Sequence, residues 1–455
     1  MYITVRERAK KPVGETGSGP SSPGRRTAER IAGTVVLLGV VSLLTDVSSE
    51  MVASVLPLYL TTQVGLGYVA YGVVDGVYQG ASAFVRIFGG YAADRWGRPK
   101  WVAVAGYGVS AVTRLLMLGA HSLPSVTGVV TADRLGKGLR TAPRDALIAD
   151  VSEPAVLGRA FGVHRALDTI GAALGPLVAF GLLATAATGT YHSVFVVSFG
   201  FALLGVAVLV VLVPNRRTSS GVGRQRFGAL LRQIGGRRLR RPLVVAALLG
   251  LFTIGDSFLY LTIQDRDGFG VMVFPLLFVG TNAAYLALAI PMGRLADRVG
   301  RARVFVAGHV ALLLAYLTAA ASWHGTASAI VSLLLLGTFY AATDGVLAAL
   351  TSRLSTPESR GTGIAAAQTV VVVSRFTASV GFGALWAVMG AGAALLVVST
   401  ALAVAIPVAM VVLRNVESEA ETAESDTEGV ADSAASPDSP DFDPVPEPAA
   451  QVDDR

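Results

Sequence analysis

Twelve apolar stretches, each long enough to cross a lipid bilayer as a helix, dominate the sequence from residue 31 onward. A helix needs about 20 residues to span the hydrocarbon layer. Only 15% of the residues are charged, whereas soluble domains carry about 25%. We therefore predict an all-α membrane protein with twelve transmembrane helices at 31–60, 68–93, 101–120, 124–148, 159–186, 191–213, 242–264, 271–296, 302–322, 327–352, 361–388 and 391–413.

Composition also narrows the chemistry. The chain has no cysteine, which excludes disulfides, thiolate catalysis and cysteine-ligated metals. Its five histidines lack ligand spacing, and no phosphate-binding loop supports ATP-driven pumping. We expect no metal, no cofactor and no enzymatic activity. Nucleic-acid binding is not expected either, because the cations lie in short loops between apolar stretches rather than on one soluble face.

The loops predict an orientation. One set of alternate loops is rich in arginine and lysine, and the opposite set holds a single cation, Arg266. Because basic loops stay in the cytoplasm, we expect a multi-pass protein of the cell membrane with both termini cytoplasmic. The expected parts are a disordered arm at 1–30, a six-helix bundle at 31–213, a basic central loop at 214–241, a second six-helix bundle at 242–413, and an acidic disordered tail at 414–455.

A charged turn occurs twice. Residues 90–100 read Gly-Tyr-Ala-Ala-Asp-Arg-Trp-Gly-Arg-Pro-Lys, and residues 293–303 read Gly-Arg-Leu-Ala-Asp-Arg-Val-Gly-Arg-Ala-Arg. Each turn follows one apolar stretch and precedes another, at equivalent places in the two bundles. The acids of span 1 and span 4 also have counterparts in span 7 and span 10. Repeated halves of this kind are typical of transporters that bind their substrate between the repeats, near the middle of the membrane.

Over residues 30–414 the sequence resembles the major facilitator superfamily, whose loop signature follows the second and eighth helices. The resemblance implies two pseudo-symmetric six-helix bundles, with helices 1, 4, 7 and 10 lining a central cavity. It also implies a conformational latch, in which the loop acid meets the positive N-terminus of a helix in the opposite half. Asp94 would face residues 361–363 and Asp297 residues 158–159. The latch residues are Gly90, Asp94, Arg95, Gly97, Arg98, Gly293, Asp297, Arg298, Gly300 and Arg301.

Span 5 carries a second family motif. Gly171, Gly175 and Pro176 resemble the signature of drug/proton antiporters, although Ala179 and Phe180 stand where a glycine pair would follow. Stretches in spans 1 and 4 are similar to a bacterial branch of efflux-type, multidrug-like permeases. Some relatives in that branch are linked to iron or siderophore handling.

Ionisable residues at membrane depth are costly, which makes them candidates for function. Asp46 and Glu50 lie four residues apart on one helix face, so the two carboxyls repel each other and are the first candidates for proton coupling. Asp75, one turn from Gln79, is the second candidate. The alternative is that many such charges form static ion pairs, such as Arg134 with Asp133 or Asp168. The full candidate set is Asp46, Glu50, Asp75, Asp133, Arg134, Lys137, Asp256 and Asp344.

Together these features predict a monomeric secondary active transporter in the lipid bilayer, which exports a small-molecule organic substrate in exchange for protons by alternating access. One alternative is proton-coupled uptake, or export of a metal chelate such as a siderophore complex. An alternative of another class is a non-transporting membrane sensor or scaffold.

Overall fold

The computed structural model describes residues 32–81, 98–153, 156–185, 191–215, 237–321, 325–355 and 360–414, and these residues form helices joined by short turns, with no strand. In the first half, residues 68–81 are helical and the 3-10 turn Met117–Gly119 extends the third helix. The other elements of this half are α1 (Gly33–Leu58) with a π-helical turn at Tyr59–Gln63, α3 (Pro99–Leu116), α4 (Leu123–Asp150), α5 (Leu157–Thr185) and α6 (Tyr191–Leu212).

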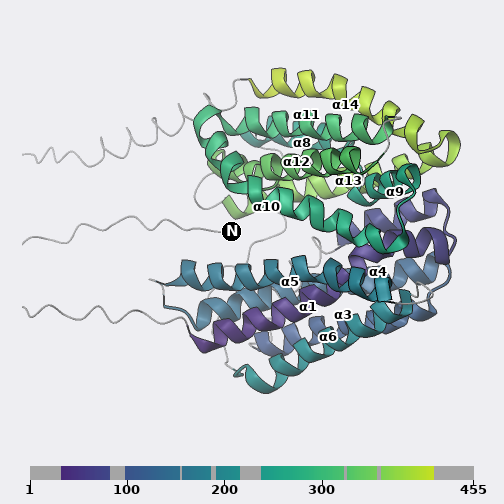
Figure 1. Cartoon of the computed structure of the whole chain (residues 1–455). Coiled ribbons are helices and arrows are strands. Elements are labelled where there is room, and N and C mark those ends of the chain that lie inside the picture. Colours follow the sequence, from purple (N-terminus) through teal and green to yellow (C-terminus); the bar gives the residue numbers. More distant parts are fainter. Residues whose placement is uncertain are drawn as a thin grey trace, which may run out of the picture.

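The second half forms its own bundle above the first in Figure 1. Its elements are α8 (Arg237–Gly250), α9 (Asp256–Asp267), a 3-10 turn at Val271–Val273, α10 (Phe274–Val299), α11 (Arg301–Ala320), α12 (Thr326–Arg353), α13 (Arg360–Met389) and α14 (Ala391–Leu413). The predicted all-α architecture of two helical bundles is confirmed.

Within the described residues, nine helices are long and apolar enough to cross a membrane. Three expected spans fall outside that set. The second, 68–93, is described only over residues 68–81, and the other two differ for physical reasons. Helix α4 carries too many charges, among them Asp133, Arg134 and Lys137. The seventh span, expected to run unbroken over 242–264, is instead interrupted at residues 251–255, and its first part, α8, already begins at Arg237 within the expected central loop.

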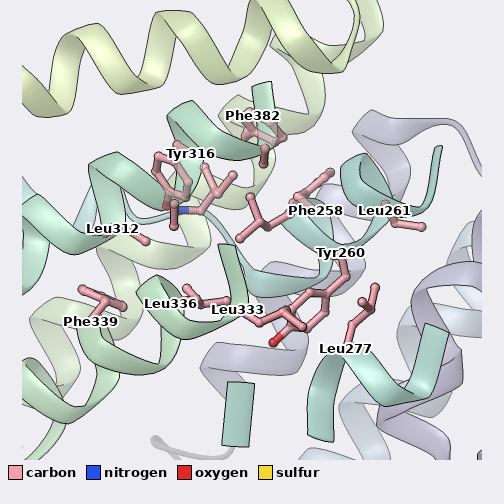
Figure 2. Packing of buried hydrophobic residues seen from close by; sticks show 14 of the residues in the cluster. Phe258, Tyr260, Leu261, Leu277, Leu312, Tyr316, Leu333, Leu336, Phe339 and Phe382 are labelled. Carbon is pink, nitrogen blue, oxygen red and sulfur yellow. The ribbon is translucent and has the colours of Figure 1, made fainter. Parts of the chain in front are cut away.

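A tyrosine side chain satisfies the backbone at this interruption. The Tyr316 hydroxyl of α11 accepts a hydrogen bond from the Ile254 amide at 3.0 Å and donates one to the Phe252 carbonyl at 3.4 Å. Backbone polar groups freed at membrane depth must find such partners, because no water reaches them. Figure 2 shows Tyr316 in the same buried region as Phe258 and Tyr260 of α9 and Phe382 of α13.

The two halves meet at one end of the molecule, which we call the closed end. There Tyr68 stacks on Trp386 with ring centroids 4.3 Å apart, and Tyr71 meets Phe258 edge-on at 5.0 Å. The main hydrophobic core is continuous across both halves through these contacts. The ribbons of the halves diverge toward the opposite end, which we call the basic end because Arg98, Arg301 and Arg353 lie there (Figure 1).

Candidate functional site

The candidate carboxylates of α1 face α4. Asp46 forms an ion pair with Arg140 at 3.5 Å, and the Lys137 ammonium is the strongest charge interaction of both Asp46 and Glu50. Among the described residues, however, Glu50 and Lys137 have no hydrogen-bond or ion-pair partner for their side chains. Three of the candidate residues, Asp46, Glu50 and Lys137, thus interact by charge, and Arg140, which the sequence analysis did not include, joins them through Asp46.

The antiporter-like motif of α5 packs against the segment of α1 that carries Asp46 and Glu50. A Cβ added at Gly171 would lie 2.4 Å from the Leu43 carbonyl oxygen, and one at Gly175 would lie 2.7 Å from the Glu50 Cβ. Only glycine lets the two backbones approach so closely. Pro176 is buried at the same contact. The motif therefore fixes the position of the α1 segment that carries Glu50.

Asp133 and Arg134 have a structural pairing. Both are buried, and Asp133 forms one ion pair with Arg114 of α3 at 2.9 Å and another with its neighbour Arg134. The Arg134 guanidinium also lies 3.9 Å from the centre of the Tyr78 ring. This cluster ties α3, α4 and the helix at 68–81 together, as the static ion-pair interpretation expects.

Asp75 joins the two halves. Its carboxylate is buried and accepts hydrogen bonds from Gln79 at 2.7 Å, from Ser379 of α13 at 2.6 Å and from Ser257 of α9 at 3.4 Å. The sequence indicated Gln79 by its one-turn spacing but carried no signal for the two serines, which belong to the other half. Asp75 is therefore an inter-half contact rather than a group facing open space.

In the second half, Asp256 begins α9 and accepts a 2.6 Å hydrogen bond from the Tyr340 hydroxyl. The Arg375 guanidinium lies over the Tyr340 ring at 5.6 Å, and its buried Nε has no hydrogen-bond partner. Arg375 has charge interactions with Asp256 and with Asp344, which is exposed. The one sequence signal for Arg375 is that it is the sole cation at membrane depth in the predicted spans of this half.

Most of the first copy of the latch (Gly90, Asp94, Arg95 and Gly97) lies outside the described residues; Arg98 precedes the first turn of α3. In the second copy, Gly300 takes a positive φ of 104° at the turn between α10 and α11, a conformation that favours glycine. Asp297 is exposed and pairs with Arg301 of its own half at 2.9 Å. A Cβ added at Gly293 would meet nothing within 4 Å, and Arg298 is exposed. The predicted contact of Asp297 with the start of α5 stays a prediction.

The comparisons with known proteins agree with this architecture. The sequence pattern of the Major Facilitator Superfamily matches residues 38–281 and 268–442. An uncharacterised MFS-type transporter of Methanocaldococcus jannaschii is 30% identical over 358 residues, which cover 77% of this chain and 88% of that protein. An uncharacterised protein of Mycobacterium tuberculosis is 32% identical over 253 residues, covering 55% of this chain and 59% of that protein.

Solved structures share the fold at low sequence identity. The nucleoside transporter NupG superposes with a TM-score of 0.71 at 14% identity, covering 84% of this chain and 99% of that one. A POT family transporter in complex with 5-aminolevulinic acid gives 0.68 at 12% identity, covering 84% and 96%. The match of the family pattern to most of the chain makes this multi-pass membrane protein a transporter of the major facilitator superfamily.

Proposed function

We propose that this transporter exports a small organic molecule in exchange for protons, with Glu50 as the principal proton-binding group and Asp46 as its partner. The proposal rests on two charged side chains, those of Glu50 and Lys137, which form no hydrogen bond or ion pair among the described residues. Glu50 of α1 and Lys137 of α4 attract each other by charge, while nearby charges such as Asp46 and Asp133 are held in ion pairs. A protonated Glu50 is neutral, and an ionised Glu50 has the Lys137 ammonium beside it. Such a carboxyl can load and release a proton without breaking a structural ion pair.

The shape of the bundle supports alternating access. The halves touch at the closed end, and their ribbons lie farther apart toward the basic end, so we assign substrate access in this conformation to the basic side (Figure 1). Basic loops favour the cytoplasm, so this conformation corresponds to an inward-facing state. Both termini would then lie in the cytoplasm and the protein in the cell membrane. The latch predicted at Asp94 and Asp297 would act in the outward-facing state, which agrees with Asp297 being exposed here.

Charges of both halves offer contacts for a polar substrate. Lys137 and Glu50 lie in the first half, and Arg375 and Asp344 in the second; none of the four has a hydrogen bond or ion pair to its side chain among the described residues. A substrate held between the halves could reach both sets, and it would be released when the halves rock apart. Solved relatives in fold include a nucleoside transporter and a human organic anion transporter, which is consistent with a small organic substrate.

Proteoliposomes containing the purified protein test this proposal. We expect a pH gradient to drive substrate flux in the unmodified protein, and Glu50→Gln or Asp46→Asn to abolish it while the protein still inserts. Glu153→Gln, which removes an exposed carboxylate from a loop, is the matched control and should keep the flux. Unchanged proton-coupled flux in both Glu50→Gln and Asp46→Asn would refute the assignment.

The direction of transport needs a separate measurement. Cells that express the protein should accumulate a transported dye more slowly than cells that express Glu50→Gln. Faster accumulation would instead favour the alternative of proton-coupled uptake.

A further inference from the structure

The contact between the two halves follows one helix face. Gly72, Gly76 and Gly80 recur every four residues on the helix at 68–81, and a Cβ at each would meet α13 at 2.5, 2.7 and 3.3 Å. Gly383 of α13 packs in return against the Tyr68 carbonyl, where a Cβ would lie 2.4 Å from the oxygen. We call this contact between residues 68–81 and α13 the seam. Its closeness means that the seam must separate if the closed end is to open.

Asp75 lies in the middle of the seam, between the glycines. Asp75 is only 6% exposed, and Tyr71, one turn toward the closed end, packs on Phe258. A Cβ at Gly255 would lie 2.1 Å from the Asp75 Oδ2, so the interruption of the seventh span brings α9 directly against this carboxylate. Aromatic side chains therefore cover Asp75 from the closed end.

The hydrogen bonds of Asp75 match an ionised carboxylate. Ser379 and Gln79 both donate to Oδ2, and Ser257 donates to Oδ1. An ionised carboxylate only accepts hydrogen bonds, whereas a protonated one carries a donor of its own. A proton on Oδ2 would meet two groups that donate to this oxygen, the Gln79 amide and the Ser379 hydroxyl, and of these only the hydroxyl can also accept. Protonation thus removes acceptor capacity where two of the three donors converge, one of them from the opposite half.

Few other charges surround this carboxylate. Tyr71 and Tyr78 lie on its own helix, Asp256 on α9 and Arg375 on α13. Of these, Asp256 already accepts the Tyr340 hydroxyl, and Arg375 interacts with Asp75 by charge without a hydrogen bond. An ionised Asp75 is attracted to Arg375 across the seam, and a neutral one is not. Both the hydrogen bonds and this attraction weaken when Asp75 takes a proton.

We propose that Asp75 is an ionised clasp that holds the closed end shut through Ser379 and Ser257, and that a proton taken by its carboxylate releases the seam. The proton comes from water and neutralises the carboxylate without any other bond being formed or broken. This inference rests on the proposed function for its purpose, because it would let protonation open the closed end. It assigns to Asp75 a role separate from the Glu50 pair: Asp75 controls the contact between the halves.

Spin labels measure the seam directly. The chain contains no cysteine, so Gln63→Cys with Val388→Cys would label only the closed end, and Asp150→Cys with Arg353→Cys only the basic end. We expect the closed-end distance to lengthen on acidification in the otherwise unmodified protein. In Asp75→Asn, which mimics the neutral acid, it should be long at neutral pH and no longer respond to acid. Asp265→Asn, which neutralises an exposed carboxylate on α9, should behave as the unmodified protein does.

Ser379→Ala is a second test, which remains informative if Asp75→Asn misfolds. It removes one hydrogen-bond donor of the other half and leaves the Asp75 carboxylate in place. We expect it to lengthen the closed-end distance at neutral pH and to shift the acid response toward higher pH. A short distance with a normal acid response in Asp75→Asn, or an unaltered response in Ser379→Ala, would overturn the clasp. The flux assay separates the two proposals: an Asp75-dependent seam without proton-coupled flux would support the clasp alone, and coupled flux with a seam insensitive to Asp75 would overturn it.

Discussion

Gly175 of α5 lies so close to Glu50 of α1 that a Cβ at the glycine would be 2.7 Å from the glutamate Cβ. The same Cβ would approach the Val47 carbonyl oxygen at 2.8 Å and the Met51 amide nitrogen at 2.9 Å. Because two of these three neighbours are backbone atoms, rotation of a side chain cannot relieve the clash. The antiporter-like motif and the proposed proton site are thus parts of one packing contact.

Gly175→Ala should therefore destabilise the protein by about 1–3 kcal/mol, the usual cost of overpacking, and should displace Glu50. Gly181→Ala is the matched control on the same helix, since a Cβ there meets nothing within 4 Å. It should be neutral or stabilise by up to about 1 kcal/mol through helix propensity. Thermal unfolding in detergent measures both, and equal melting temperatures for the two variants would contradict the packing argument.

The buried charges of α4 lead to a second prediction. Asp133 is the shared partner of Arg114 and Arg134, all three being almost fully buried. Asp133→Asn leaves both guanidinium groups without a counter-charge, and breaking a buried pair in this way costs about 3–5 kcal/mol. We expect poor yield and a lowered melting temperature.

Asp145→Asn is the control for this prediction, because Asp145 pairs with Arg144 at 3.0 Å and its side chain is 44% exposed. An exposed pair contributes only about 0–1 kcal/mol. If Asp133→Asn melted at the same temperature as Asp145→Asn, the buried cluster would not be structural, and Asp133 would return to the candidates for transport.

The sequence was sufficient to predict the all-α membrane fold and its two helical bundles, because hydrophobic segments and the repeated motifs are visible in the sequence itself. Helix α4 is an example. Its charges exclude it from the membrane spans that hydropathy alone would identify, but its position in the repeated halves predicts that it is one. The interruption at residues 251–255 was not predictable, since no proline marks it. Tyr316, which satisfies the freed backbone, lies more than 60 residues away.

The candidate site, too, could be predicted from the sequence only in part. The shared face of Asp46 and Glu50 follows from helical spacing, but the pairing of Asp46 with Arg140 depends on how α1 and α4 pack. Gly72, Gly76 and Gly80 recur every four residues in the sequence, but this spacing does not show which helix covers them. Only the fold shows that α13 covers them and that Asp75 bonds to Ser379.

A third prediction concerns the latch. A carboxylate at a helix N-terminus contributes about 0.3–1 kcal/mol when exposed, which is small enough to be broken in every transport cycle. Asp94→Asn should therefore reduce the rate of transport more than it reduces expression or thermal stability. Flux per inserted molecule in proteoliposomes is the measurement. Loss of expression with normal flux per molecule would argue for a structural role instead. Asp297→Asn should behave in the same way, because its present partner, Arg301, is only a surface pair.

The seam offers the last prediction. A Cβ at Gly72 would lie 2.5 Å from the Ser379 carbonyl oxygen and 3.3 Å from the Val380 Cα, so an alanine there forces the helix at 68–81 away from α13. Gly72→Ala should lengthen the spin-label distance between Gln63→Cys and Val388→Cys at neutral pH. Gly67→Ala, one turn earlier in the chain and with no atom within 4 Å of the added Cβ, should leave it unchanged.

The comparison with Asp75→Asn makes this prediction specific. Gly72→Ala opens the seam by steric contact and keeps the Asp75 carboxylate. The distance between the two spin labels at the closed end should therefore still depend on pH. Asp75→Asn removes the titrating group, so its long distance should be independent of pH. If Gly72→Ala also lost all response to acid, the steric contact rather than the charge of Asp75 would control closure. If its distance stayed short, the close packing of Gly72 against α13 would not hold the two halves together.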